Sequence, residues 1–94
     1  MVDTFWHVEK GGKWVNDSGI DTFFSADVTC VLAEEKHICF WFDVCGFIEG
    51  ILYNPVIVLK DGRKIYPCYY YGGVTKEDAG KDVKWWSKMI EGTR

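Results

Sequence analysis

The sequence predicts an α+β fold: a mainly antiparallel sheet of five or six strands, connected as hairpins in meander order, with one C-terminal helix packed on one face. Two observations support this prediction. Short segments rich in β-branched and aromatic residues alternate with turn residues over most of the chain, and one helical stripe of apolar residues follows at the end. The 94 residues are enough for one core, so we expect residues 1–94 to form a single domain.

The first hairpin is predicted by a pair of glycines. Thr4–Glu9 and Lys13–Asn16 are the expected strands, and Gly11 and Gly12 between them accept the positive φ that a tight turn requires.

Residues 20–27 show no clean period, so we expect an irregular segment in which Phe23 and Phe24 both plug the core. A competing interpretation extends a helix over Ser25–Lys36, because Ser25 can cap it and the residues near its end favour helix.

Two paired strands are expected in the middle of the chain. Val28–Leu32 and His37–Val44 are rich in β-branched and aromatic residues, and Ala33–Lys36 would form a four-residue loop between them. In that register, Cys30 lies directly opposite Cys39.

The clearest local signal is Asp61-Gly62. It lies between Val56–Lys60 and Arg63–Tyr66 and predicts a two-residue hairpin with a type I′ turn. Upstream of this hairpin, Gly50 interrupts the apolar segment 47–53 and indicates either a β-bulge or a close approach of another backbone segment there.

The C-terminal helix is predicted by its capping residues. Thr75 can cap the first turn, and Glu77 and Asp78 favour the positive end of the helix dipole. We expect the helix to end near Glu91, before Gly92. The predicted buried stripe has spacings of four, three and four residues and consists of Ala79, Val83, Trp86 and Ile90.

Charge and hydropathy exclude two classes of partner. The net charge is −3 with the signs mixed along the chain, whereas a nucleic-acid-binding surface needs a basic stripe. The N-terminal residues lack the basic region of a signal peptide, and no apolar run approaches the roughly 20 residues that span a bilayer. We therefore expect no nucleic acid, no membrane and a cytoplasmic location, in which the four cysteines stay reduced.

A zinc site is one chemical hypothesis, because Cys30, His37 and Cys39 with Cys45 or Cys68 are ligand types that zinc prefers. Their spacing contains no Cys-x-x-Cys knuckle, which favours ordinary small buried thiols over a metal centre. We expect no metal and no cofactor.

Cysteine catalysis is also disfavoured. A thiolate needs an imidazole within hydrogen-bond reach, but the Cβ atoms of His37 and Cys39 on one strand are roughly 6.5 to 7 Å apart and their side chains diverge. We therefore expect no enzymatic activity.

Aromatic residues make up 17% of the chain and occur in runs. Successive residues of a strand point to opposite faces, and successive helical residues differ by about 100°, so one face cannot bury a whole run. Exposed Trp and Tyr are typical anchors of protein interfaces. The same rings could instead fill a second covered face, and in so short a chain that cover most easily comes from another molecule. The residues expected to contact a partner are Trp41, Tyr69, Tyr70, Tyr71, Trp85 and Met89.

These observations favour a non-enzymatic protein-binding module that self-associates as a dimer and engages a protein partner. Its size and character suit a stoichiometric inhibitor or adaptor such as those encoded by phages and mobile elements. The alternative is a small-molecule binder with an aromatic-lined cleft that stacks a planar, nucleotide-like ligand, oriented by Asp43, Arg63 and Lys64.

Overall fold

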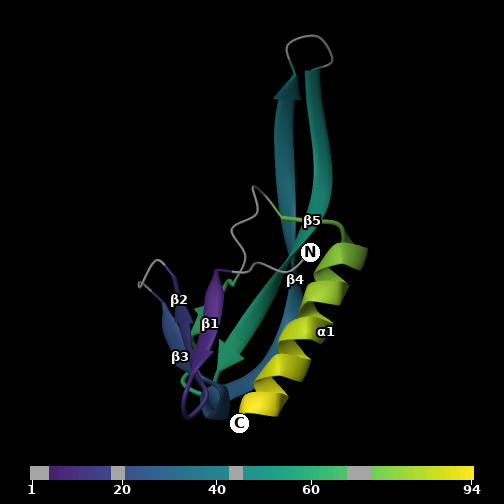
Figure 1. The fold of residues 1–94 in the computed structure, drawn as a ribbon. Helices are drawn as coiled ribbons and strands as arrows, with labels where there is room; N and C mark the ends of the chain where they lie inside the picture. Colours follow the sequence, from purple (N-terminus) through teal and green to yellow (C-terminus); the bar gives the residue numbers. More distant parts are fainter. Residues whose placement is uncertain (1–4, 18–20, 43–45, 68–72) are drawn as a thin grey trace.

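The computed structural model describes residues 5–17, 21–42, 46–67 and 73–94, and for residues 38–42 and 46–49 it describes the backbone. The described chain is elongated, with principal extents of 53 × 25 × 23 Å (Figure 1). Two three-stranded antiparallel sheets with strand orders β1-β2-β3 and β4-β5-β6 pack with the C-terminal helix α1. The elements are β1 (Trp6–Glu9), β2 (Lys13–Asn16), β3 (Thr22–Phe24), β4 (Val28–Phe42), β5 (Gly46–Leu59), β6 (Lys64–Ile65) and α1 (Lys76–Thr93).

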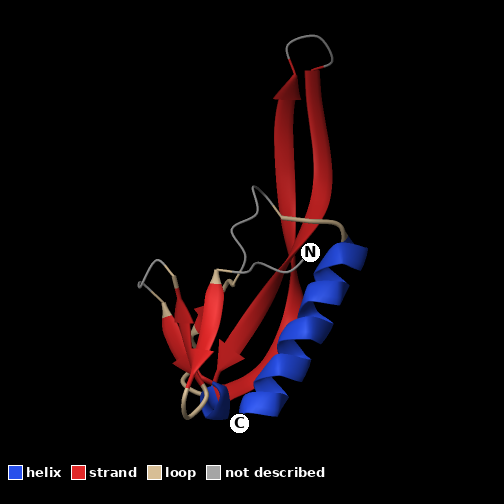
Figure 2. Ribbon diagram, in the orientation of Figure 1, coloured by secondary structure: helices blue, strands red, loops and turns tan. Residues whose placement is uncertain are grey.

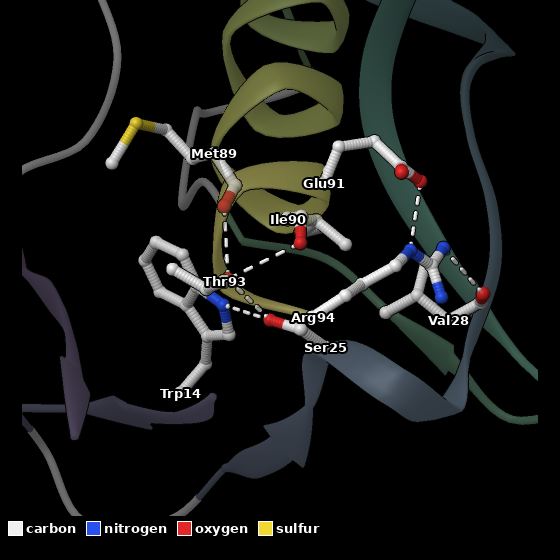
Figure 3. Close-up of polar contacts among 8 residues, drawn as sticks. All are labelled: Trp14, Ser25, Val28, Met89, Ile90, Glu91, Thr93 and Arg94. Carbon is white, nitrogen blue, oxygen red and sulfur yellow. Dashed lines mark hydrogen bonds and ion pairs between the residues drawn. The ribbon is translucent and has the colours of Figure 1, made fainter. Parts of the chain in front are cut away.

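The predicted α+β class, the meander order and the C-terminal helix are confirmed, but the prediction of five or six strands in one sheet is wrong. The sheets separate at a 3₁₀ turn, Ser25–Asp27, which redirects the chain after β3. This turn is held by a relay of hydrogen bonds (Figure 3). Trp14 Nε1 donates to Ser25 Oγ at 2.8 Å, Ser25 and Thr93 hydroxyls lie 2.6 Å apart, and Thr93 donates to the Met89 carbonyl at 2.9 Å.

The first hairpin forms where the glycine pair predicts it, with Trp6 paired to Asn16 and Glu9 to Lys13. Both glycines have positive φ, +84° at Gly11 and +77° at Gly12. Gly12 has a second constraint, because a Cβ atom there would overlap the carbonyl oxygen of Thr93 at the end of α1. The absence of a side chain thus lets the hairpin loop approach the helix.

The segment 20–27 is more regular than predicted, since it contains β3 and the 3₁₀ turn. Phe23 is buried as expected, but Phe24 is 45% exposed, so its predicted core role is wrong. The reason is the alternation of a strand, which sends the two neighbouring rings to opposite faces. The competing helix over Ser25–Lys36 is also wrong, because only the short 3₁₀ turn is helical there.

The largest correction concerns the middle of the chain. Residues 33–36 are part of one continuous strand, β4, which pairs with β5 rather than folding back on itself. Cys30 therefore lies opposite Val58, and Cys39 opposite Glu49. The pairing runs without interruption through Gly50, so the bulge predicted there is absent, and the register shift falls between Val28 and Cys30 instead.

The β5–β6 hairpin is confirmed, but its turn type differs from the prediction. A type I′ turn needs positive φ at both central residues, and in the described chain only glycines have positive φ, so Asp61 does not qualify. Gly62, at φ +89°, instead closes a three-residue loop in which its N–H donates to the Leu59 carbonyl at 3.0 Å.

Helix α1 begins where predicted, with the Asp78 N–H donating to the Thr75 side chain at 3.2 Å, and it extends two residues beyond the expected end. Ala79, Trp86 and Ile90 are buried as predicted, whereas Asp82 occupies the buried face and Val83 is half-buried. The helix packs along β4 and β5 (Figure 2).

An aromatic cluster joins the helix to the first sheet. The Trp86 ring lies 5.1 Å from that of Trp14 and 5.9 Å from that of Trp6, edge-on in the second case. Around these rings the described core consists of Trp6, Trp14, Phe23, Val28, Ile57, Leu59, Ile65, Trp86 and Ile90. Rings this large contribute much of the buried area of a small domain.

Candidate functional site: the β4–β5 hairpin

The β4–β5 hairpin extends well past the rest of the described chain (Figure 1). Part-way along β5, Tyr53 is bridged to Val74, and the N–H and C=O of Tyr53 both bond to Val74 at 2.8 Å. Helix α1 begins two residues later, at Lys76, and accompanies only the half of the hairpin nearer the first sheet. We call residues 36–42 and 46–52, which lie beyond this bridge, the distal hairpin.

The sequence explains why β4 is so long. Residues 28–42 contain no Gly, Pro, Asn or Asp, the residues that most favour turns. Asp43 and Gly46 supply such residues where β4 ends and β5 begins. This distribution favours a single long strand, and β4 pairs with β5 without interruption from Cys30 opposite Val58 to Phe42 opposite Gly46.

The Val74 bridge depends on Gly73, which sits at φ +119°. A Cβ atom there would lie 2.8 Å from the Tyr53 carbonyl oxygen and 3.1 Å from the Leu52 Cβ. Glycine thus lets the chain cross the outer edge of β5 before the helix begins. Past this crossing, no described strand pairs with β5 on that side.

The outer edge of β4 has no strand partner among the described residues, since β4 is the first strand of its sheet. The Val28 carbonyl at one end of this edge accepts a hydrogen bond from Arg94 Nη2 at 3.0 Å. Alternate N–H and C=O groups of an antiparallel strand point away from its neighbour, so such an edge is a template for another strand. Its central residues, Glu34 to His37, are polar or charged and the flanking residues are apolar.

Described side chains on both strands of the hairpin expose apolar surface. Leu32 on β4 is 40% exposed and Ile51 on β5 is 48% exposed. The distal hairpin is also apolar in sequence, with Ile38-Cys39-Phe40-Trp41-Phe42 on one strand and Phe47-Ile48 on the other. A two-stranded hairpin is marginally stable in water by itself, and an apolar one gains stability when another surface covers it.

A polar network reinforces the hairpin where it leaves the core. The Glu34 carboxylate accepts hydrogen bonds from Tyr66 Oη at 2.8 Å and Lys64 Nζ at 3.1 Å. These bonds, with the Tyr66 bond the larger cause, lower the pKa of Glu34. The bond to Glu34 likewise raises the pKa of Lys64 and that of Tyr66. The network ties the β6 arm to β4 across β5.

Of the residues predicted to contact a partner, Trp85 and Met89 lie on helix α1 and Trp41 lies on strand β4. Trp85 lies on α1, 37% exposed, with its ring 5.0 Å from that of Trp86, and Met89 is half-buried against the core. Trp41 lies near the distal end of β4, opposite Phe47 and beyond the helix. Tyr69, Tyr70 and Tyr71 fall outside the described residues.

The residues of the ligand-binding alternative are engaged in separate contacts. Arg63 forms an ion pair with Asp61 at 2.9 Å in the β5–β6 loop, while Lys64 pairs with Glu34. Asp43 lies outside the described residues. Arg63 does line a surface depression, whose described lining consists of Asp27, Leu59, Lys60, Asp61 and Arg63 and includes no aromatic residue.

The metal-ligand candidates are spread along the hairpin. Cys30 and His37 are seven residues apart on β4, which separates them by roughly 23 Å and places them on opposite faces. Cys39 lies nine residues from Cys30 along the same strand, and Cys45 is outside the described residues. No group of three or more metal-ligating side chains occurs within the part of the chain that the structure describes.

Sequence reasoning missed the free edge of β4, because it assigned residues 33–36 to a loop. One signal could have revealed the longer strand, namely the lack of any turn-forming residue between Val28 and Phe42. It also missed the contact of Glu34 with Lys64 and Tyr66, which depends on a register that no local pattern specifies.

Comparison with protein-family models, curated proteins and solved structures yields no match to this chain. Across the described residues, no helix combines the length and apolar character needed to cross a bilayer. The class of protein therefore has to be argued from the hairpin itself.

Proposed function

We propose that this chain is a non-enzymatic protein-binding module that binds through the β4–β5 hairpin and associates with itself. The observation that carries this proposal is the long hairpin whose outer strand, β4, has no described neighbour. An added strand would satisfy the outward backbone groups of β4, and a covering surface would bury apolar side chains such as Leu32 and Ile51. The small size of the chain suits a stoichiometric inhibitor or adaptor, of the type that phages and mobile elements encode.

Of the residues predicted from the sequence, Trp41 belongs to the binding hairpin by its place in β4. Trp85 offers a second exposed indole, on helix α1. The proposal therefore gives Trp41 the primary role and Trp85 an accessory one.

The test compares two apolar-to-charged variants with matched exposure. Ile51→Lys places a charge on the hairpin, and Phe24→Lys places one on β3, at residues that are 48% and 45% exposed. Both variants should fold, because neither side chain belongs to the core. Tagged protein is used to capture partners from the source cells, and the affinity of each captured protein is then titrated.

The expected result is a loss of affinity on the order of tenfold or more for Ile51→Lys, because a lysine would be desolvated at the interface. Phe24→Lys should bind as the unchanged protein does. Equal binding by both variants, or loss confined to Phe24→Lys, would show that the hairpin is not the binding surface.

A further inference from the structure

We infer that the outer edge of β4 binds β4 of a second copy, antiparallel, about a two-fold axis at Glu35. This inference rests on the proposed function and specifies one occupant of the hairpin edge. The joined hairpins would form a four-stranded sheet in the order β5-β4-β4-β5, with the helices at opposite ends.

Symmetry restricts the registers that two identical strands can adopt. Residues directly opposite each other share a face of the sheet, and the faces alternate along a strand. A two-fold axis that relates two identical antiparallel strands keeps each residue on its own face of the sheet. Each residue can therefore lie opposite only a residue an even number of positions away, and the residue at the axis lies opposite its own copy. Glu35 is the middle residue of β4 (Val28–Phe42), so an axis there allows the greatest overlap of the two strands.

Charge selects the same register. With Glu35 at the axis, Glu34 of each copy lies opposite Lys36 of the other, so two pairs of opposite charge form against the one like pair that the two Glu35 carboxylates make at the axis. The Glu34 side chain is only partly exposed and forms an ion pair with Lys64 of its own chain, and this ion pair holds it in place on the edge strand. A shift of the axis to Glu34 or to Lys36 also opposes one like-charge pair, and it forms no Glu–Lys pair to offset that repulsion.

Apolar residues match in this register as well. Leu32, which is 40% exposed, stands opposite Ile38 of the second copy, and Val31 stands opposite Cys39. The Val28 carbonyl is already bonded to Arg94, so the ladder would run from Cys30 to Phe40 and fray at its ends. The two-fold axis brings each flank of the strand opposite the other flank. A charged centre with apolar residues on both sides therefore matches itself when this edge pairs with its own copy.

The main test uses two charge reversals, Lys36→Glu and Glu34→Lys, measured by sedimentation equilibrium. Each variant alone opposes like charges twice, so we expect its dimerisation to weaken on the order of tenfold or more. Mixed together, the two variants restore both opposite-charge pairs, and a heterodimer of twice 10.9 kDa should form. A monomeric unchanged protein, variants that dimerise as it does, or a mixture without heterodimer would each overturn the inference.

A cross-link provides an independent readout, because Glu34→Lys also removes the ion pair with Lys64 and can impair folding. In Glu35→Cys the new thiol lies opposite its own copy, and mild oxidation should link two chains at position 35. His37→Cys is the control, since its position lies opposite Ala33 and not opposite itself. Peptide mapping separates these links from those of the native cysteines, and equal self-linking at both positions would contradict the axis.

These outcomes separate the two proposals. If the unchanged protein is monomeric but Ile51→Lys still loses a different protein partner, the self-pairing register is wrong and the proposed function stands. If neither self-association nor partner binding depends on the hairpin, both are wrong.

Discussion

Adjacent aromatic residues in the described chain divide between the core and the surface. Trp86 is fully buried while Trp85 is 37% exposed, and Phe23 is buried while Phe24 is 45% exposed. The buried rings form the cluster that joins α1 to the first sheet. The exposed rings follow from backbone geometry, because neighbouring residues of a strand or helix cannot point the same way.

Gly12 provides the sharpest residue-level test of how the hairpin loop packs against the helix. Gly11→Ala places a side chain at positive φ in open space and should cost about 1 kcal/mol of unfolding free energy. Gly12→Ala adds the overlap with the Thr93 carbonyl and should cost about 2 to 4 kcal/mol. Urea denaturation followed by tryptophan fluorescence measures both, and equal costs would show that the loop and helix end do not approach closely.

At the level of elements, the Glu34 network links stability to pH. The pKa of Glu34 is lowered from 4.5 in the folded protein, so its contribution is present above pH 4.5 and is lost as the pH falls through the folded pKa. The pKa of Tyr66 is raised from 10.0 and that of Lys64 from 10.5, so their contributions are lost as the pH rises through the folded pKa values. The attachment of β6 to β4 should therefore be strongest between these limits.

Tyr66→Phe tests this network directly. The phenol is the largest cause of the lowered pKa of Glu34, so its removal should raise that pKa toward 4.5 while Lys64 retains part of the effect. A carboxyl carbon NMR titration measures the change. Tyr53→Phe is the control, because the Tyr53 hydroxyl lies 3.4 Å from Glu35 instead. An unchanged Glu34 titration in Tyr66→Phe would mean that the two side chains do not interact.

The sequence predicts the helix and the hairpins that are specified by residues close to one another in the chain. Thr75 and the spacing of Ala79, Trp86 and Ile90 indicate α1, and the glycines indicate both short hairpins. The partner of β4 could not be predicted, because pairing with β5 depends on contacts between residues up to 31 positions apart, such as Val28 and Leu59. The candidate site was predicted only through Trp41, since a free strand edge is a property of the backbone rather than of residue type.

The shape of the whole molecule follows from the hairpin. A compact domain of this length should have a radius of gyration near 12 Å, whereas the Cα value is 15.1 Å. The excess arises because the distal hairpin leaves the core unaccompanied by α1 or the first sheet (Figure 1). This shape leaves the edge of β4 without a described strand neighbour beside the exposed side chain of Ile51, and the proposed binding role rests on these two features.

Residue-resolved amide hydrogen exchange, measured at high and at low protein concentration, tests this role most directly. Between Cys30 and Phe40, the β4 amides that face β5 should be protected at both concentrations. Those that face outward should gain protection at high concentration, as a second β4 covers them, while the amides of α1 stay unchanged. Rapid exchange of every outward β4 amide at all concentrations would contradict self-pairing through this edge.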